Sequence, residues 1–247
     1  MNIKNYLDAT YLKTAAQAQL SEEENAQHIT AFIQEAIAEE YKLVMLRPEW
    51  VSLAKQLIAA VNSKVTIGTV IDFPLGQSSL EAKLAEAQLA IENGADDLDF
   101  VCNYEAFKHG NLDLVKKEIL ACTQLGLDHH KIVKWIIEVA ALQPKQIVQL
   151  TTLIKNCVIA NFKEHCYNQV FIKSSTGFYV TPANEPNGAT QEAIILMLEN
   201  GFPLPIKAAG GVRNYEEAVA MIRLGVKRIG TSAAKQIAHG EAHESAY

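Results

Sequence analysis

The sequence lacks the motifs that mark the common nucleotide-binding folds, and it has few cysteines. Neither G-x-G-x-x-G nor G-x-x-x-x-G-K-[ST] occurs in its 247 residues, which argues against a dinucleotide site and a P-loop. The four cysteines, Cys102, Cys122, Cys157 and Cys166, show no C-x-x-C spacing and no pairing pattern, and we see no secretory leader. We therefore expect reduced thiols in a cytoplasmic protein.

Long apolar runs and an excess of basic residues are also missing. Apolar runs such as residues 43–46 and 65–71 fall far short of the roughly 20 residues that a membrane helix needs. The 28 acidic and 22 basic residues give a net charge of −6, and both signs are scattered along the chain. We expect neither a nucleic acid nor a membrane surface as the partner.

The histidines give little support for a metal site. His129 and His130 are adjacent in the sequence, as are His165 and Cys166, and adjacent residues of one element do not converge on one ion. Neither pair has an acidic or histidine partner at a ligand spacing. We expect no metal, and we interpret these histidines as solvated loop residues.

The chain does contain a regular alternation of strand and helix patterns. Strands that alternate with helices pair in parallel, and eight such units in about 250 residues are typical of a closed barrel. We predict a single domain over residues 1–247, a (β/α)8 TIM barrel with a short N-terminal extension. An open doubly wound sheet is the alternative, weakened by the missing nucleotide motifs. The predicted strands cover residues 6–10, 43–46, 65–73, 97–101, 131–138, 170–173, 205–208 and 226–230.

Signals at the helix ends support this division of the chain. Ser21 followed by Glu24 predicts a capping box at the start of a helix over residues 21–39. Pro48 suits the first turn of the helix predicted over residues 50–61. Gly94 is well placed to end the preceding helix with a residue in the left-handed conformation. Asn214 is a plausible N-cap.

Lys173 ends the predicted strand over residues 170–173. It shares a face with Phe171 while Val170 and Ile172 take the other, and neither face is polar. A buried lysine loses its proton more easily and becomes a nucleophile that can form a Schiff base with a carbonyl. On this segment alone, a lysine that extends its ammonium to water is the simpler interpretation.

Other charged residues lie toward the same ends of the predicted strands. Lys134 and Glu138 share a face of the strand over 131–138, and Lys207 ends the seventh strand. Asp97 and Asp99 share one face of the fourth strand, which we expect to be the barrel interior. We predict that Lys207 lowers the pKa of Lys173 and that Asp99 moves protons with Lys207. An ion pair that only stabilises the barrel is the alternative.

Glycine-containing segments follow the last two strands, where barrels frequently bind phosphate. Gly210, Gly211 and Val212 follow the seventh strand, and Gly230 and Ser232 lie at the end of the eighth. We expect backbone N–H groups there to bind an anion. The full set of predicted phosphate-binding and substrate-binding residues is Asp8, Thr10, Thr176, Gly177, Gly210, Gly211, Val212, Gly230 and Ser232.

Seven segments of the chain, in order and spacing, match one family. They are residues 8–13 (DATYLK), 69–76 (TVIDFPLG), 94–99 (GADDLD), 134–138 (KWIIE), 173–178 (KSSTGF), 207–213 (KAAGGVR) and 228–232 (RIGTS). Over its full length, the chain resembles the class I deoxyribose-phosphate aldolases.

The resemblance implies that Lys173 forms the Schiff base, that Lys207 and Asp99 handle protons, and that Lys134 supports them. It also implies reversible cleavage of 2-deoxyribose 5-phosphate to acetaldehyde and glyceraldehyde 3-phosphate without a metal or an organic cofactor. A homodimer is possible.

The chain departs from the family pattern at four positions. Ser174 replaces threonine, Ala209 replaces serine, Val139 replaces threonine, and Asp72 replaces glycine, which adds a negative charge near a strand end. Some family members end in a tyrosine that enters the active site, so Tyr247 is a further catalytic candidate, with a frayed tail as the alternative. Another Schiff-base aldolase, of the transaldolase or keto-acid type, or an inactive phosphosugar-binding barrel are the other possible functions.

Overall fold

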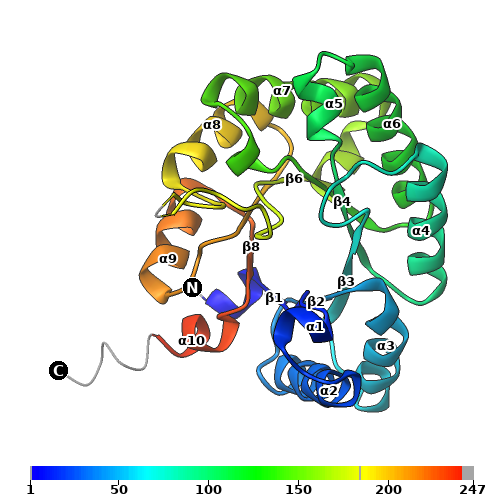
Figure 1. The fold of residues 1–247 in the computed structure, drawn as a ribbon, viewed down its shortest axis with the longest axis vertical. Coiled ribbons are helices and arrows are strands. Elements are labelled where there is room, and N and C mark those ends of the chain that lie inside the picture. Colours follow the sequence, from blue (N-terminus) through cyan, green and yellow to red (C-terminus); the bar gives the residue numbers. More distant parts are fainter. Residues whose placement is uncertain (1, 184, 241–247) are drawn as a thin grey trace.

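The computed structural model describes residues 2–183 and 185–240 (Figure 1). Its eight parallel strands pair in chain order, and β1 pairs with β8 to close the barrel. The predicted (β/α)8 barrel is therefore confirmed. The strands are β1 (Leu7–Thr10), β2 (Leu43–Leu46), β3 (Thr66–Ile71), β4 (Asp97–Val101), β5 (Ile132–Ile136), β6 (Val170–Lys173), β7 (Ile206–Ala209) and β8 (Arg228–Thr231).

Helices surround the barrel, and the connection after each strand contains at least one of them (Figure 1). No helix among the described residues is long and apolar enough to cross a membrane. The helices longer than five residues are α2 (Glu22–Ala38), α3 (Val51–Ala60), α4 (Leu80–Glu92), α6 (Leu112–Asp128), α7 (Pro144–Asn161), α8 (Gln191–Gly201), α9 (Tyr215–Leu224) and α10 (Ala234–His239). The remaining helical segments are the short helices α1 (Ala15–Ala18) and α5 (Tyr104–Lys108) and the 3-10 helices η1 (Ile3–Tyr6), η2 (Pro48–Trp50), η3 (Val139–Ala141) and η4 (Glu164–Gln169).

The main hydrophobic core lies between the strands and the surrounding helices. Leu98, Phe100 and Trp135 are fully buried in it, and the Phe100 and Trp135 rings stack with their centroids 5.3 Å apart. The Trp135 indole N–H donates to Thr123 Oγ1 on α6 at 3.0 Å. Because side chains alternate along a strand, the residues between these apolar positions point into the barrel.

The predicted helix ends are present. Ser21 Oγ accepts from the Glu24 N–H at 3.2 Å, and Glu24 Oε2 accepts from the Ser21 N–H at 2.8 Å, which completes the capping box. Pro48 occupies the first turn of η2, and Asn214 Oδ1 accepts from the Glu217 N–H at the start of α9. Gly94 has φ +102° just beyond α4. The capping predictions are therefore confirmed.

Two strands end earlier than predicted because the backbone turns into the left-handed region. β5 ends at Ile136 and not at Glu138, whose φ is +54°. β3 ends at Ile71, and Asp72 follows with φ +53°, a conformation that glycine adopts without strain. Two bonds from Ser78 and an ion pair with Lys83 at 3.5 Å hold the Asp72 carboxylate within the loop. The prediction that Lys134 and Glu138 share a strand face is wrong, because Glu138 lies outside the strand.

Candidate active site

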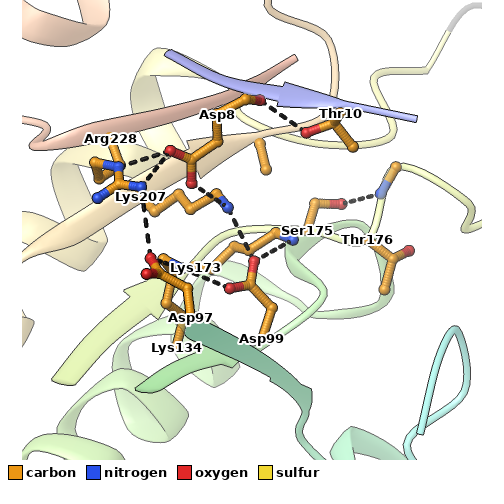
Figure 2. Close-up of polar contacts among 12 residues, drawn as sticks. Asp8, Thr10, Asp97, Asp99, Lys134, Lys173, Ser175, Thr176, Lys207 and Arg228 are labelled. Atoms are coloured by element: carbon orange, nitrogen blue, oxygen red, sulfur yellow. Dashed lines mark hydrogen bonds and ion pairs between the residues drawn. The ribbon is translucent and has the colours of Figure 1, made fainter. Parts of the chain in front are cut away.

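The strand register determines which residues point into the barrel. Asp97 and Asp99 lie opposite Gly68 and Val70 of β3, and Asp99 also lies opposite Lys134 of β5. Parallel pairs between the other neighbouring strands close the barrel in the same way. One part of the interior is therefore charged (Figure 2). Its buried members are Asp8 of β1, Asp97 and Asp99 of β4, Lys134 of β5, Lys173 of β6, Lys207 of β7 and Arg228 of β8.

Three of these lysines meet on the carboxylate of Asp99. Asp99 Oδ2 lies 2.9 Å from Lys173 Nζ and 2.9 Å from Lys207 Nζ, and Asp99 Oδ1 lies 2.7 Å from Lys134 Nζ. Lys173 and Lys207 lie opposite each other on neighbouring strands, so the barrel holds both ammonium groups beside one oxygen. The expected convergence of Lys173, Lys207 and Asp99 is present in the structure.

Two further carboxylates complete the network. Asp8 lies 2.6 Å from Lys207 Nζ and 2.6 Å from the Arg228 guanidinium, and Asp97 lies 2.6 Å from Lys134 Nζ and 3.5 Å from Arg228. Among the described residues, this charged network therefore contains four basic groups and three acids. A neutral Lys173 leaves Lys134, Lys207 and Arg228 balanced by Asp8, Asp97 and Asp99.

Burial and neighbouring charge move the pKa values of this network apart. Burial, reinforced by Lys207, lowers the pKa of Lys173 to about 8 against the opposing attraction of Asp99. Burial would lower the pKa of Lys134 too, but Asp97 and Asp99 outweigh it and raise that pKa. Burial opposes ionisation of Asp99, yet the three lysines hold its pKa well below the usual range. Lys173 is therefore the buried lysine that can become a neutral amine near neutral pH.

A cavity of about 430 Å³ lies over Lys173, at the carboxyl ends of the strands. Loops after β1, β6, β7 and β8 form its walls. Asp8 does not line it, because the Asp8 carboxylate is buried against Lys207 and Arg228. The predicted phosphate or substrate residues in the wall are Thr10, Thr176, Gly177, Gly210, Gly211, Val212, Gly230 and Ser232.

The glycine loop after β7 offers backbone donors to this cavity. Gly210 has φ +82° and Gly211 has φ +89°, values that favour glycine. Gly188 packs against Gly210 so closely that a Cβ on Gly188 would lie 2.5 Å from the Gly210 carbonyl oxygen. Within the described residues, the N–H groups of Gly211, Val212 and Ser232 have no protein acceptor. Such N–H groups can bind an anion.

An apolar cluster inside the barrel lies beside the charged residues. Leu12, Leu43, Met45 and Val70 are buried there, with Phe73 and Phe178 packed against them. The Phe73 and Phe178 rings meet edge to face at 5.0 Å, and the Arg47 guanidinium lies over Phe73. Leu12 and Phe178 also line the cavity, so the substrate space has an apolar wall next to its amine.

The sequence interpretation assigned no role to this apolar wall or to Arg228. Alternation within β2 and β3 could have placed Leu43, Met45 and Val70 on one face, but choosing the inner face needs the register with β4. Arg228 belongs to the matching segment over residues 228–232, but the sequence does not show which way its side chain points. It points into the barrel because it lies opposite Lys207 on the neighbouring strand. Tyr247 lies outside the described residues.

Comparison with known proteins gives a consistent result. The model of the DeoC/LacD family of aldolases matches residues 7–238. The deoxyribose-phosphate aldolase of Thermococcus gammatolerans is 36% identical over 241 residues, which cover 97% of this chain and 96% of the relative. The solved structure of an aldolase described as QR15 is 30% identical with a TM-score of 0.80, covering 99% of this chain and 98% of the other.

A second solved structure is similar to this chain over nearly its whole length. The deoxyribose phosphate aldolase of Aeropyrum pernix, described as having a unique tetrameric structure, is 25% identical with a TM-score of 0.77. The match covers 99% of this chain and 92% of the other.

Proposed function

This chain belongs to the DeoC/LacD family of aldolases, and we propose that its substrate is 2-deoxyribose 5-phosphate. The reaction is reversible cleavage to acetaldehyde and glyceraldehyde 3-phosphate through a Schiff base on Lys173. The observation that carries the proposal is the buried amine of Lys173, with a pKa lowered to about 8, at the base of a cavity whose loops carry unpaired N–H groups.

Lys173 supplies the covalent chemistry. Its neutral amine adds to the C1 aldehyde, and loss of water gives a protonated imine. A base removes the proton of the C3 hydroxyl, the C2–C3 bond breaks, and its electron pair moves toward the imine nitrogen. Glyceraldehyde 3-phosphate leaves, and the enamine that remains takes a proton at C2. Hydrolysis then releases acetaldehyde and restores the amine.

Asp99 and Lys207 are suited to the proton transfers. Asp99 Oδ2 lies 2.9 Å from both Lys173 Nζ and Lys207 Nζ, so a proton can pass between the carbinolamine and Lys207 through one carboxylate or a water beside it. Asp8, which is itself paired with Arg228, holds Lys207 from the other side. Lys134 stays cationic because its pKa is raised, and it balances the charge of Asp99.

The phosphate of the substrate would bind at the loops after β7 and β8. The free N–H groups of Gly211, Val212 and Ser232 face the cavity region, and Arg213 contributes a positive charge to its wall. Gly230 has a second role, because a Cβ there would lie 3.1 Å from Lys207 Cε. The smallest residue therefore leaves room for the Lys207 side chain.

Two measurements on the unmodified protein test the proposal. Release of glyceraldehyde 3-phosphate from 2-deoxyribose 5-phosphate should be catalysed, while transaldolase and keto-acid substrates should react far more slowly. Borohydride reduction with acetaldehyde should leave an ethyl group on Lys173, identified by peptide mass spectrometry. Binding of the sugar phosphate without cleavage or a reduced adduct would instead support a phosphosugar-binding barrel, and cleavage of a keto acid alone would support another Schiff-base aldolase.

The wider setting of the enzyme is also a proposal. We expect it to work in the cytoplasm, as one domain over residues 1–247 that can form a homodimer. The tetramer described for the Aeropyrum pernix relative shows that assembly differs from that simplest case in one related protein. Sedimentation would measure the assembly here, and a Tyr247→Phe variant would test the proposed role of the last residue.

A further inference from the structure

Glu138 is a buried acid for which the proposed chemistry has no use. It follows β5, has φ +54° and is 1% exposed. Its carboxylate does not line the cavity over Lys173. Burying a carboxylate costs free energy unless hydrogen-bond donors surround it. The donors around Glu138 therefore indicate its role.

The partners of Glu138 all lie in the loop that follows Lys173. Glu138 Oε1 accepts from the Ser175 hydroxyl at 2.5 Å. Glu138 Oε2 accepts from the Thr176 N–H at 3.1 Å and also from the Thr176 hydroxyl. Three donors from two consecutive residues therefore converge on one carboxylate.

These bonds extend to the next two residues of the loop. The Phe178 N–H donates to Thr176 Oγ1 at 3.0 Å, and the Gly177 N–H donates to Ser175 Oγ at 3.4 Å. Because both hydroxyl groups can direct their protons to Glu138, their oxygen atoms are free to accept from these N–H groups. Thr176, Gly177 and Phe178 line the cavity, so Glu138 controls the shape of one of its walls.

Lys173 is held by separate contacts. Its carbonyl oxygen accepts from the Ile137 N–H at 3.0 Å, its strand pairs with β5 and β7, and its Nζ contacts Asp99. A change in the loop after Lys173 can therefore alter one cavity wall without moving the amine.

We propose that Glu138 is a positioning residue that holds Thr176, Gly177 and Phe178 beside the glycine loop after β7, where the phosphate end of the substrate would bind. A Cβ on Gly177 would lie 3.9 Å from Gly210 Cα, so the position of the loop after β6 limits the space at that phosphate site. Glu138 thereby sets the preference for a phosphorylated sugar over the same sugar without phosphate. This inference rests on the proposed function, and it assigns Glu138 no contact with the reacting atoms.

The test replaces Glu138 by glutamine. Glu138→Gln keeps the size of the side chain, but its amide nitrogen cannot accept a hydrogen bond. We expect kcat/KM for 2-deoxyribose 5-phosphate to fall by about tenfold or more, mostly through KM. We expect the Ki of inorganic phosphate to rise by a similar factor. Activity on 2-deoxyribose and ethylation of Lys173 by acetaldehyde and borohydride should stay within about twofold.

Two other variants complete the design. Glu118→Gln is a matched control, because Glu118 is a buried glutamate, also 1% exposed, that pairs with Lys83 in the outer layer. It should leave the preference for the phosphorylated sugar unchanged. Thr176→Val removes one hydroxyl donor to Glu138, so it should reduce that preference in the same direction, and it replaces Glu138→Gln if the latter fails to fold.

The possible outcomes separate this inference from the proposed function. Equal losses on the phosphorylated and unphosphorylated sugars would overturn the inference, as would an unchanged preference and an unchanged phosphate Ki. If the unmodified protein does not cleave 2-deoxyribose 5-phosphate, the proposed function fails. Thermal stabilisation by inorganic phosphate would then still test Glu138, because it should be present in the unmodified protein and lost in Glu138→Gln.

Discussion

Lys83 and Lys173 are both buried beside carboxylates, yet their surroundings differ. Lys83 of α4 lies in the outer layer, 2.6 Å from Glu118 and 3.5 Å from Asp72. The carbonyl oxygens of Gly76 and Val101 also accept from it at 3.0 and 3.4 Å. Among the described residues, Lys173 in the barrel forms an ion pair with one carboxylate, that of Asp99, and it shares this carboxylate with two other lysines.

The difference shows that burial alone does not produce a nucleophilic amine. Lys83 has two acids and two carbonyl groups around a single positive charge, so its ammonium group has several acceptors of its own. Around Lys173 there are more bases than acids, and burial with Lys207 nearby lowers its pKa to about 8. The balance of charge around each lysine, and an opening to a cavity, distinguish the reactive amine from the structural one.

Lys173→Leu tests the reactive side of this comparison and should have the largest effect. Leucine keeps the bulk and removes the amine, so turnover should fall by at least about 10⁴-fold and borohydride trapping should disappear. The melting temperature should not fall, because the variant removes a buried charge that burial disfavours. A reduced acetaldehyde adduct elsewhere in a still active variant would identify a different nucleophile.

Lys207→Met removes the positive neighbour of Lys173 that also pairs with Asp8 and Asp99. We expect kcat to fall by about 10²- to 10⁴-fold because a proton-transfer group is lost. The pKa of Lys173, read from the pH dependence of trapping, should rise because a cation that lowers it is gone. Lys235→Met is the control, since Lys235 is an exposed lysine paired with Glu35. Full activity of Lys207→Met would contradict the proton-transfer role.

Lys83→Met tests the structural side of the comparison. Removing one partner of a buried pair leaves Glu118 and Asp72 uncompensated and should cost about 3–5 kcal/mol of unfolding free energy. Urea denaturation measures this loss. The kcat of the folded fraction should stay within about twofold, and no adduct should form on Lys83 in the unmodified protein. A collapse of kcat without a loss of stability would show that Lys83 takes part in catalysis.

The pH dependence of trapping should give the smallest effect. With a Lys173 pKa of about 8, the neutral amine increases about tenfold between pH 7 and pH 9 and then levels off. Because this pKa lies below that of an unfolded lysine, the unfolded chain binds more protons between the two values. Unfolding free energy should therefore rise with pH above about 8, relative to Lys173→Leu. Trapping that continues to rise steeply beyond pH 10 would mean an unperturbed lysine.

The sequence alone was sufficient to predict the order of strands and helices, because side-chain periodicity and helix caps are local properties of the chain. Ser21, Pro48, Gly94 and Asn214 all have the roles that their neighbours in the chain predict. The closed barrel followed from counting eight alternating units. The positions of Lys173, Lys207 and Asp99 at one end followed from parallel pairing, which brings the carboxyl ends of all strands together.

Only the tertiary structure determined how those charges share partners. Arg228 binds Asp8 from 220 positions away in the chain, and Lys207 meets Asp99 from 108 positions away. Such contacts depend on strand register and barrel closure, which no local pattern encodes. Glu138 and Asp72 left their strands because each adopts a left-handed conformation that propensity does not predict for an acidic residue. The sequence therefore identified the candidate residues for the proposed chemistry, and the closed barrel brought them into contact and gave Lys173 the surroundings that lower its pKa.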